Sequence, residues 1–448
     1  MAHGFRRVDR DQQFLLPPDL REWLPEGHLA RFVVEVVEQL DLSEVAAGYR
    51  LGGPGRRAYD PSMLTALLLY GYATGQRSSR QLERACVTDI ACRFITANQA
   101  PDHATIARFR AVHQEALSGL FVQVLRLAVD AGLVDASVLA VDATRIGANA
   151  SMDANVTAQR LAALAEQIFA EAAETDAAED QLYGELRGDE PAPGWEAGPG
   201  RAARIRQALD ELAAQQPAGQ AERDAQRAER IAQGKKPLGR KRLPADPNKP
   251  GRLSSRATRQ RVNLTDPTSR LMKGRRGYLQ GYSGQAVATR GQIIVAAELT
   301  NQAADNRALR PMLDLARKTL HAAGVSTEPT TLLADNGYWN TDQITQLTRD
   351  HPDLDLLVAP SGDRKVRNRP PPRVDDDSDM AKMTATFTDP DTQTRYRQRA
   401  AAVEPIFAHI KTNRRLDRLL RRGLHAANHE WQLICTAHNL TKIHAARA

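Results

Sequence analysis

Three acidic residues, far apart in the sequence, are the first candidates for chemistry. Asp142 lies inside the apolar run VLAVDATRI, residues 138–146. Sheet propensity disfavours Asp in such a run, and burial would penalise a charge that has no partner. An acid at this position therefore needs a compensating group, unless its strand lies at an edge of the sheet.

Asp335 follows a second apolar run, in the segment LLADNGYW. The Asn-Gly pair after it is a turn signal, because both residues tolerate the left-handed backbone. Turn formation alone would explain this acid. Open α/β sheets, however, hold ligands and catalytic groups at the carboxyl ends of their strands, and Asp335 follows a strand-like run.

Glu404 lies in the segment YRQRAAAVEPIFAHIKTNRRL. Arg397 is seven residues before it and Lys411 seven after it, so all three fall near one face of a helix. Pro405 should place Glu404 at a helix start or a kink, or outside ideal helical geometry. A surface stripe of Arg, Glu and Lys with no further role is the alternative interpretation.

Together the three acids favour metal-dependent chemistry. Separated carboxylates without a His or Cys cluster suit Mg²⁺ or Mn²⁺ better than zinc. Two such ions about 4 Å apart can activate a water or a 3′-hydroxyl and stabilise the leaving oxygen in phosphodiester displacement. Cys86, Cys92 and Cys435 have no CxxC spacing, so the sequence predicts neither a zinc site nor a disulfide framework.

The elements that must position these acids follow from the hydrophobic pattern after Gly132. Strands are predicted at 138–146, on both sides of a turn at 289–292, and at 330–333 and 354–359. Helices are predicted at about 305–322 and from about 342. Consecutive strands followed by alternating helices and strands imply an α/β sheet with antiparallel and parallel parts.

The region from Leu29 to about Leu133 has helical spacing throughout. Within it, residues 78–84 and 102–110 predict a short helix, a turn and a short basic helix, which is compatible with a helix-turn-helix unit. Arg108 and Arg110 would then contact DNA. A plain helical bundle with an exposed basic helix is an equally good interpretation.

A long insertion separates the first two predicted strands. The insertion, from about 151 to 261, has an Ala- and Glu-rich first part and a second helical part after a Pro/Gly break, which predicts an α-helical hairpin or a small helical subdomain. It ends in the basic run GKKPLGRKRLPADPNKPGR, either a solvated loop or a DNA-contacting arm. The segment RPPPRVDDDSD reads as an exposed loop. The closing stretch WQLICTAHNLTKI predicts an apolar helix on the core, with His438 in a structural role.

Length and charge set the outer limits. At 448 residues and 42% apolar content, the chain should form two or three folded units. Its 61 Lys and Arg against 54 Asp and Glu give a net charge of +7, which favours a polyanionic partner, most often nucleic acid. The sequence has no signal-like apolar segment and no apolar run long enough to cross a membrane, so we expect a cytoplasmic protein.

Four segments in a fixed order resemble the DDE transposases of bacterial insertion sequences. They are VDAT at Asp142, NLTDPTSRLMK followed by GYLQGYSGQAV, LLADNGYW at Asp335, and YRQRAAAVEPIFAHIK at Glu404. The helical segments YDPSMLTALLLYGYATGQRSSRQLE and PDHATIARFR resemble the N-terminal domain common in that group. The similarity covers most of the chain and is least in the insertion.

The resemblance implies an RNase H-like mixed sheet flanked by helices. An all-α DNA-binding domain, residues 1–132, would precede a catalytic domain, residues 133–448. The helical insertion at 151–261 would interrupt that domain between its first and second strands.

The resemblance also implies a metal-dependent enzyme that binds the terminal inverted repeats of its own element in double-stranded DNA. It would nick DNA by water attack and join the freed 3′-hydroxyl to target DNA. Asp142 would bridge two Mg²⁺ or Mn²⁺ ions, with Asp335 and Glu404 each holding one. A homodimer would bring the two ends together, in association with the nucleoid.

The family's catalytic helix carries Tyr, Arg, Glu and Lys in that order, and the last three contact DNA ends or metal. Tyr396, Arg399, Glu404 and Lys411 match it, although four residues rather than three separate Arg399 from Glu404. Arg397, in better register with Glu404, is the alternative to Arg399.

The basic run KTNRRLDRLLRRG that follows is well placed for phosphate contact, and its predicted contacts include Arg414 and Arg415. Two other functions remain open at this point. One is an RNase H-like nuclease that cuts without strand transfer. The other is a decayed or domesticated transposase that binds DNA as a non-catalytic regulator.

Overall fold

The computed structural model describes residues 19–49, 58–157, 160–161, 163–164, 203–212, 261–274, 277–360 and 379–447. The basic run at 234–252, most of the insertion and nearly all of the proline- and Asp-rich segment at 369–379 lie outside these residues. Among the helices described, none combines the length and the apolar character that crossing a membrane requires.

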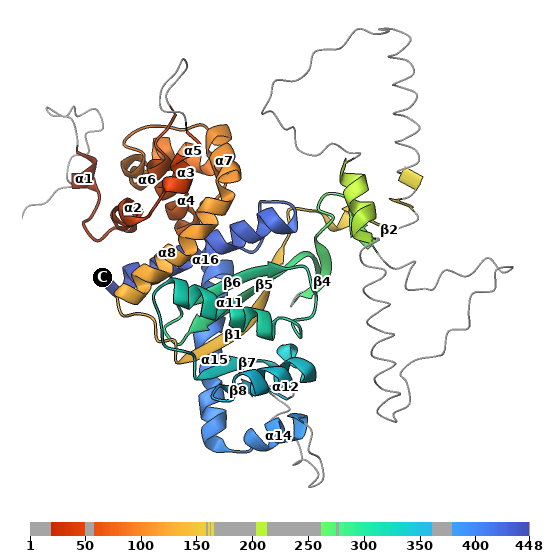
Figure 1. The fold of residues 1–448 in the computed structure, drawn as a ribbon. Helices are drawn as coiled ribbons and strands as arrows, with labels where there is room; N and C mark the ends of the chain where they lie inside the picture. The colour runs from red at the N-terminus through yellow and green to blue at the C-terminus, as the bar shows by residue number, and fades with distance from the viewer. Residues whose placement is uncertain are drawn as a thin grey trace, which may run out of the picture.

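A mixed sheet lies at the centre of the molecule (Figure 1). Its main path runs β4-β5-β1-β7-β8, and β6 pairs with β5. β1 is antiparallel to β5 and parallel to β7, which is parallel to β8. The strands are β1 (Val138–Gly147), β4 (Arg270–Gly274), β5 (Gly277–Thr289), β6 (Ile294–Thr300), β7 (Thr331–Ala334) and β8 (Asp355–Val358).

Helices cover both faces and one edge of this sheet. In Figure 1, α15 lies behind the sheet and α11 in front of it. α16 packs along β6, and Asn439 on α16 both donates to and accepts from the backbone of Ile294. The edge strand β6 is therefore covered by a helix. These helices are α11 (Leu309–Ala322), α12 (Thr341–Asp350), α14 (Asp379–Thr386), α15 (Pro390–Ala408) and α16 (Leu424–Arg447).

The strands predicted at 138–146, on both sides of the turn at 289–292, at 330–333 and at 354–359 are present. The helices predicted at about 305–322 and from about 342 are present too, which confirms the α/β class and the mixed sheet. β4 was not predicted. A short antiparallel pair of strands at the base of the insertion, β2 (Asn155–Thr157) and β3 (Arg261–Asn263), was also missed. Residues 203–212 are helical and pack on this strand pair, and together they form a second, small hydrophobic core.

The N-terminal part is helical, as its spacing predicted. Its helices are α1 (Leu20–Trp23), α2 (Leu29–Gln39), α3 (Ser43–Ala46), α4 (Pro61–Thr74), α5 (Ser79–Thr88), α6 (Ile90–Ile95), α7 (His103–Val112) and α8 (Gln114–Asp130). α5 and α7 pack together, but α6 lies between them in sequence, so the single connecting turn expected of a helix-turn-helix unit is wrong.

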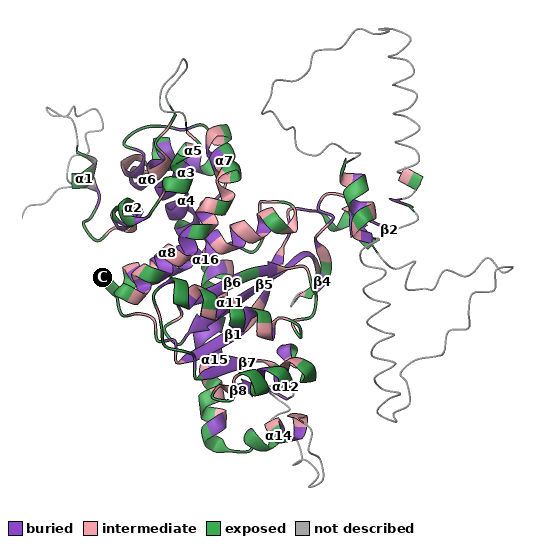
Figure 2. Ribbon diagram, viewed as in Figure 1, coloured by how far each residue is buried: buried purple, intermediate pink, exposed green. Residues whose placement is uncertain are grey.

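The helical part and the sheet share one core. α16 packs on α4 and α8 as well as on β6, and Figure 2 shows buried residues running through all of them. The buried carboxylate of Glu430 on α16 accepts hydrogen bonds from Tyr72, Arg77 and the backbone N–H groups of Leu420 and Arg421. This acid therefore connects the N-terminal helices to the C-terminal region.

Candidate active site

Asp142, inside β1, and Asp335, directly after β7, lie at the same level of two neighbouring strands. In the parallel pair of β1 and β7, Val141 is opposite Ala334. The residue that follows Val141 is Asp142, and the residue that follows Ala334 is Asp335. Neighbouring strands lie about 4.8 Å apart, so the two carboxylates start from adjacent backbone positions. This register brings together two acids that are far apart in the sequence.

Asp335 begins a 3₁₀ turn, η2 (Asn336–Tyr338), and its Oδ1 accepts a hydrogen bond of 2.8 Å from the Gly337 N–H. The predicted turn is therefore present, but the expected left-handed backbone is not: Gly337 is not among the residues with positive φ. A Cβ on Gly337 would lie 3.0 Å from Asp335 Oδ1. A larger residue at this position would therefore crowd the carboxylate of Asp335, while the backbone itself is not left-handed.

The surroundings of Asp142 disfavour its charge. Burial raises the pKa of this carboxyl to about 6, and nearby Asp335 adds to the rise, while Arg399 opposes it. The side chain is only 17% exposed. A group in this position gains from an added cation, because a cation would offset both the lost hydration and the repulsion from Asp335.

Arg399 on α15 links two of the three acids. Its Nη1 lies 2.9 Å from Asp142 Oδ2 and its Nη2 lies 3.7 Å from Glu404 Oε1. The ring of Tyr396 lies 5.9 Å from the same guanidinium. Arg397, the alternative raised by the sequence, is exposed on the same helix. The extra residue before Glu404 therefore does not prevent Arg399 from reaching it.

Glu404 occupies the interior of α15, which continues through Pro405 to Ala408. The expectation that Pro405 would put Glu404 at a helix start or outside helical geometry is wrong. Pro405 has no N–H for the carbonyl of Ala401, and that carbonyl accepts a hydrogen bond of 3.1 Å from Gln292 instead. The disturbance comes later, as a π-helical turn, η3 (His409–Asn413).

The three acids supply carboxylate oxygens, the donors that Mg²⁺ and Mn²⁺ prefer. Asp142 and Asp335 are adjacent, whereas Glu404 has a side chain that is 62% exposed and turned toward Arg399. The three groups do not meet within 4.8 Å of one another. The residues therefore fit a hard divalent cation by donor type and charge, and Glu404 has room to turn toward it.

Lys411, in the π-helical turn, is anchored on β1 just beyond Asp142. Its Nζ donates hydrogen bonds of 3.0 Å to Thr144 Oγ1 and 2.6 Å to the carbonyl of Arg145. Burial lowers the pKa of this ammonium group. Lys411 thus fixes the end of α15 against the strand that carries the first acid.

A polar network that the sequence did not reveal lies beside the acids. Arg145 forms an ion pair of 2.9 Å with Asp305, and Gln285 donates a hydrogen bond of 2.7 Å to the same carboxylate. The hydroxyl of buried Tyr338, in the turn after Asp335, donates to Gln285. The one available signal was Arg145, a charged residue in the apolar strand of Asp142.

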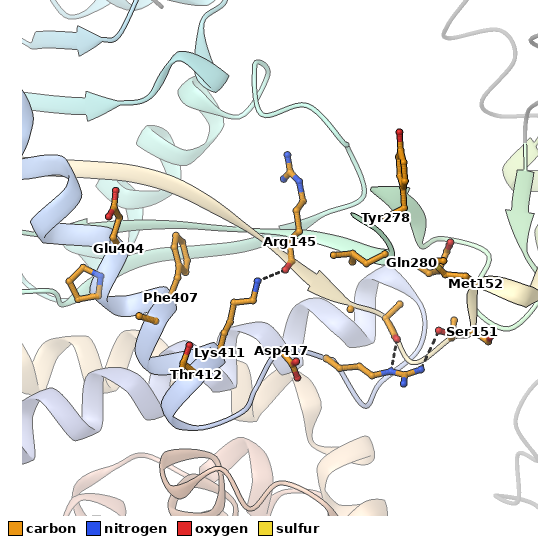
Figure 3. Close-up of a pocket in the computed structure, with 17 residues that line it drawn as sticks. Arg145, Ser151, Met152, Tyr278, Gln280, Glu404, Phe407, Lys411, Thr412 and Asp417 are labelled. Atoms are coloured by element: carbon orange, nitrogen blue, oxygen red, sulfur yellow. Dashed lines mark hydrogen bonds between the residues drawn. The ribbon is translucent and has the colours of Figure 1, made fainter. Parts of the chain in front are cut away.

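A groove of about 1230 Å³ runs from Glu404 along the end of β1 to the base of the insertion. Figure 3 shows Glu404 and Phe407 at one end, Lys411 and Arg145 in the middle, and Tyr278 with Met152 at the other. Tyr278 is 63% exposed. The groove is wide, polar in its middle, and open beside the third acid.

The other predicted DNA contacts differ in their exposure. Arg108 and Arg415 are exposed. Arg110 is half-buried and donates a hydrogen bond of 3.0 Å to the carbonyl of Arg77. Arg414 is also half-buried, and its guanidinium donates to Thr441. Arg110 thus connects α7 to the segment after α4, and Arg414 connects the end of η3 to α16.

Comparison with known families gives two matches on different parts of the chain. Residues 18–112 match a transposase domain, DUF772, and residues 367–444 match a transposase DDE domain. No curated protein and no solved structure matches the chain. The first match covers α1 to α7, and the second includes the helix that carries Arg399 and Glu404. Both matches confirm the resemblance to transposases found in the sequence.

Proposed function

We propose that this chain, a DDE transposase of the insertion-sequence type, binds the inverted-repeat ends of its element and catalyses DNA cleavage and strand transfer. The observation that carries the proposal is the register of β1 and β7, which brings Asp142 and Asp335 to adjacent positions. The arrangement of β1, β5, β6, β7 and β8 also supports an RNase H-like core.

In this proposal, Asp142, Asp335 and Glu404 hold two Mg²⁺ or Mn²⁺ ions. Bound ions would activate the attacking water or 3′-hydroxyl and stabilise the leaving oxygen. Arg399 positions Asp142 and Glu404 through its two ion pairs. Lys411 holds the helix of Glu404 against β1 and faces the groove.

The groove beside Glu404 supports the binding of a DNA end. Lys411 and Arg145 supply positive charge in its middle, and exposed Tyr278 offers an aromatic ring on which a base can stack. Exposed Arg108, Arg397 and Arg415 are further candidates for phosphate contact. Two copies of the chain would be needed to hold the two ends of the element together.

The test uses the full chain and a duplex made from the DNA that flanks its gene, with an inverted-repeat end in the middle. We expect strand breakage at the end of the repeat in Mg²⁺, with a 3′-hydroxyl on the element side, and none in EDTA. A second duplex as target should then yield a joined product. Breakage that does not depend on a divalent ion would overturn the proposal, and breakage without joining would reduce it to a nuclease.

A further inference from the structure

A second group of side chains with metal-ligating atoms lies on α8 and α16 and includes none of the three acids. His425 and His429 are one helical turn apart on α16, and Glu115 faces them from the first turn of α8. Their ligand atoms all lie within 4.8 Å of one another. The side chains of His425 and Glu115 are 70% and 77% exposed, so an ion from solvent can reach them.

Each ring nitrogen of His429 has a polar neighbour, Ser118 Oγ at Nδ1 and His425 Nε2 at Nε2. Ser118 Oγ lies 2.7 Å from the carbonyl of Glu115, which can only accept, and 2.8 Å from His429 Nδ1. We assign the Ser118 proton to this carbonyl, so that Ser118 accepts from His429 Nδ1. His429 therefore carries its proton on Nδ1, and its Nε2 presents a lone pair.

The spacing of the two imidazoles suits a bound ion. His429 Nε2 lies 3.3 Å from His425 Nε2. Two zinc–nitrogen bonds of about 2.05 Å at a tetrahedral angle separate their nitrogens by about 3.3 Å. Glu115 Oε1 lies 4.0 Å from His425 Nε2, too far for a hydrogen bond and close enough to move onto a shared ion.

The geometry points to a binding site for a divalent transition metal, with Zn²⁺ as the best fit, formed by Glu115, His425 and His429. Two imidazole nitrogens and one carboxylate suit zinc, while Mg²⁺ prefers oxygen donors alone. Ser118 acts as the positioning residue that fixes the tautomer of His429. A bound ion would join α8 to α16 and so strengthen the contact between the N-terminal helices and the C-terminal helix.

The test titrates the chelator-treated full chain with Zn²⁺ by calorimetry, in excess Mg²⁺ so that oxygen-only sites are occupied. We expect the wild-type chain to bind one more Zn²⁺ than the His425→Asn and His429→Asn variants. Ser118→Ala should weaken binding at this site by about tenfold. His321→Asn, which changes an exposed histidine on α11, is the matched control and should bind as the wild type does.

Two further measurements separate a site from loose surface binding. Co²⁺ bound in place of Zn²⁺ should show the intense visible absorption of a four-coordinate ion, and the His425→Asn variant should lose it. Zn²⁺ should raise the Tm of the wild type and of His321→Asn, but not that of His425→Asn. Equal zinc stoichiometry and affinity in the wild type and the His425→Asn and His429→Asn variants would overturn the inference.

Discussion

The guanidinium of Arg399 forms an ion pair of 2.9 Å with Asp142, although 257 positions separate the two residues in the chain. Arg399 is buried on α15 and Asp142 is nearly so on β1. The same guanidinium also reaches Glu404. One arginine thus holds the first and third acids of the proposed site in a common frame before any ion is bound.

Replacement of Arg399 should cost stability. Arg399→Ala leaves Asp142 without its ion pair in a buried position, and we expect the free energy of unfolding to fall by about 2–3 kcal/mol at pH 8. Arg397→Ala, two residues away and exposed, should change it by less than about 0.5 kcal/mol. Urea denaturation of both variants provides the comparison. Equal losses of unfolding free energy in the two variants would show that the ion pair between Arg399 and Asp142 does not stabilise the folded chain.

Arg414 and Arg415 are neighbours with different surroundings, and their variants should differ accordingly. Arg415→Ala removes an exposed charge, so the salt dependence of DNA binding should fall by about one unit of slope with little change in stability. Arg414→Ala removes the hydrogen bond to Thr441, so stability should fall by about 1–3 kcal/mol. Salt titrations of DNA binding and urea denaturation give the two readouts. A reversed pattern would contradict the assignment.

Glu430 should be among the most sensitive acids in the chain. Its fully buried carboxylate binds two side chains and two backbone N–H groups, so Glu430→Ala should destabilise the protein by about 3 kcal/mol or more. Glu328→Ala breaks a surface ion pair with Arg317 and should cost less than about 1 kcal/mol. Similar losses in the two variants, measured by thermal unfolding, would rule out the connecting role of Glu430.

His438 should make stability depend on pH. Burial lowers its pKa to about 3 in the folded chain, against about 6.5 in the unfolded chain. Between these values the unfolded chain binds a proton that the folded chain does not, so stability is full above about pH 6.5 and falls as the pH drops. The contribution is about 1.4 kcal/mol per pH unit.

The His438→Gln variant tests this directly. Its amide can still donate to the carbonyl of Gln292, which accepts from His438 Nε2 in the wild type over 3.0 Å. The variant should lose stability less steeply than the wild type between about pH 6 and pH 4. Parallel profiles for the two proteins would mean that His438 is protonated in the folded chain as easily as in the unfolded one.

Local patterns in the sequence predicted much of the fold. The strands at 138–146 and 330–333 could be predicted because apolar runs bounded by turn residues specify them locally. In the structure these two strands are a parallel pair, with Val141 opposite Ala334. The strand pair at 155–157 and 261–263 was missed because about a hundred residues separate the two strands. Pairing across such a distance leaves no local signal.

The contacts of the candidate site could not be predicted from the sequence. Asp142 became a candidate because an acid is disfavoured inside an apolar strand, whereas Asp335 and Glu404 became candidates only in combination with it. The choice between Arg397 and Arg399 could not be made from spacing, since it depends on how α15 lies across β1. Asp305 had no signal at all, because its partner Arg145 is 160 positions away.

The most direct test compares cleavage of an inverted-repeat duplex in Mg²⁺ by the wild type, Asp335→Asn and Asp342→Asn. Asp342 is an exposed acid on α12, seven positions from Asp335, and serves as the matched control. We expect Asp335→Asn to lose at least about a thousandfold in cleavage rate while it binds the duplex as the wild type does. Asp342→Asn should cleave normally. Cleavage by Asp335→Asn at the wild-type rate would contradict the assignment of a metal-dependent site to Asp142 on β1 and Asp335 at the end of β7.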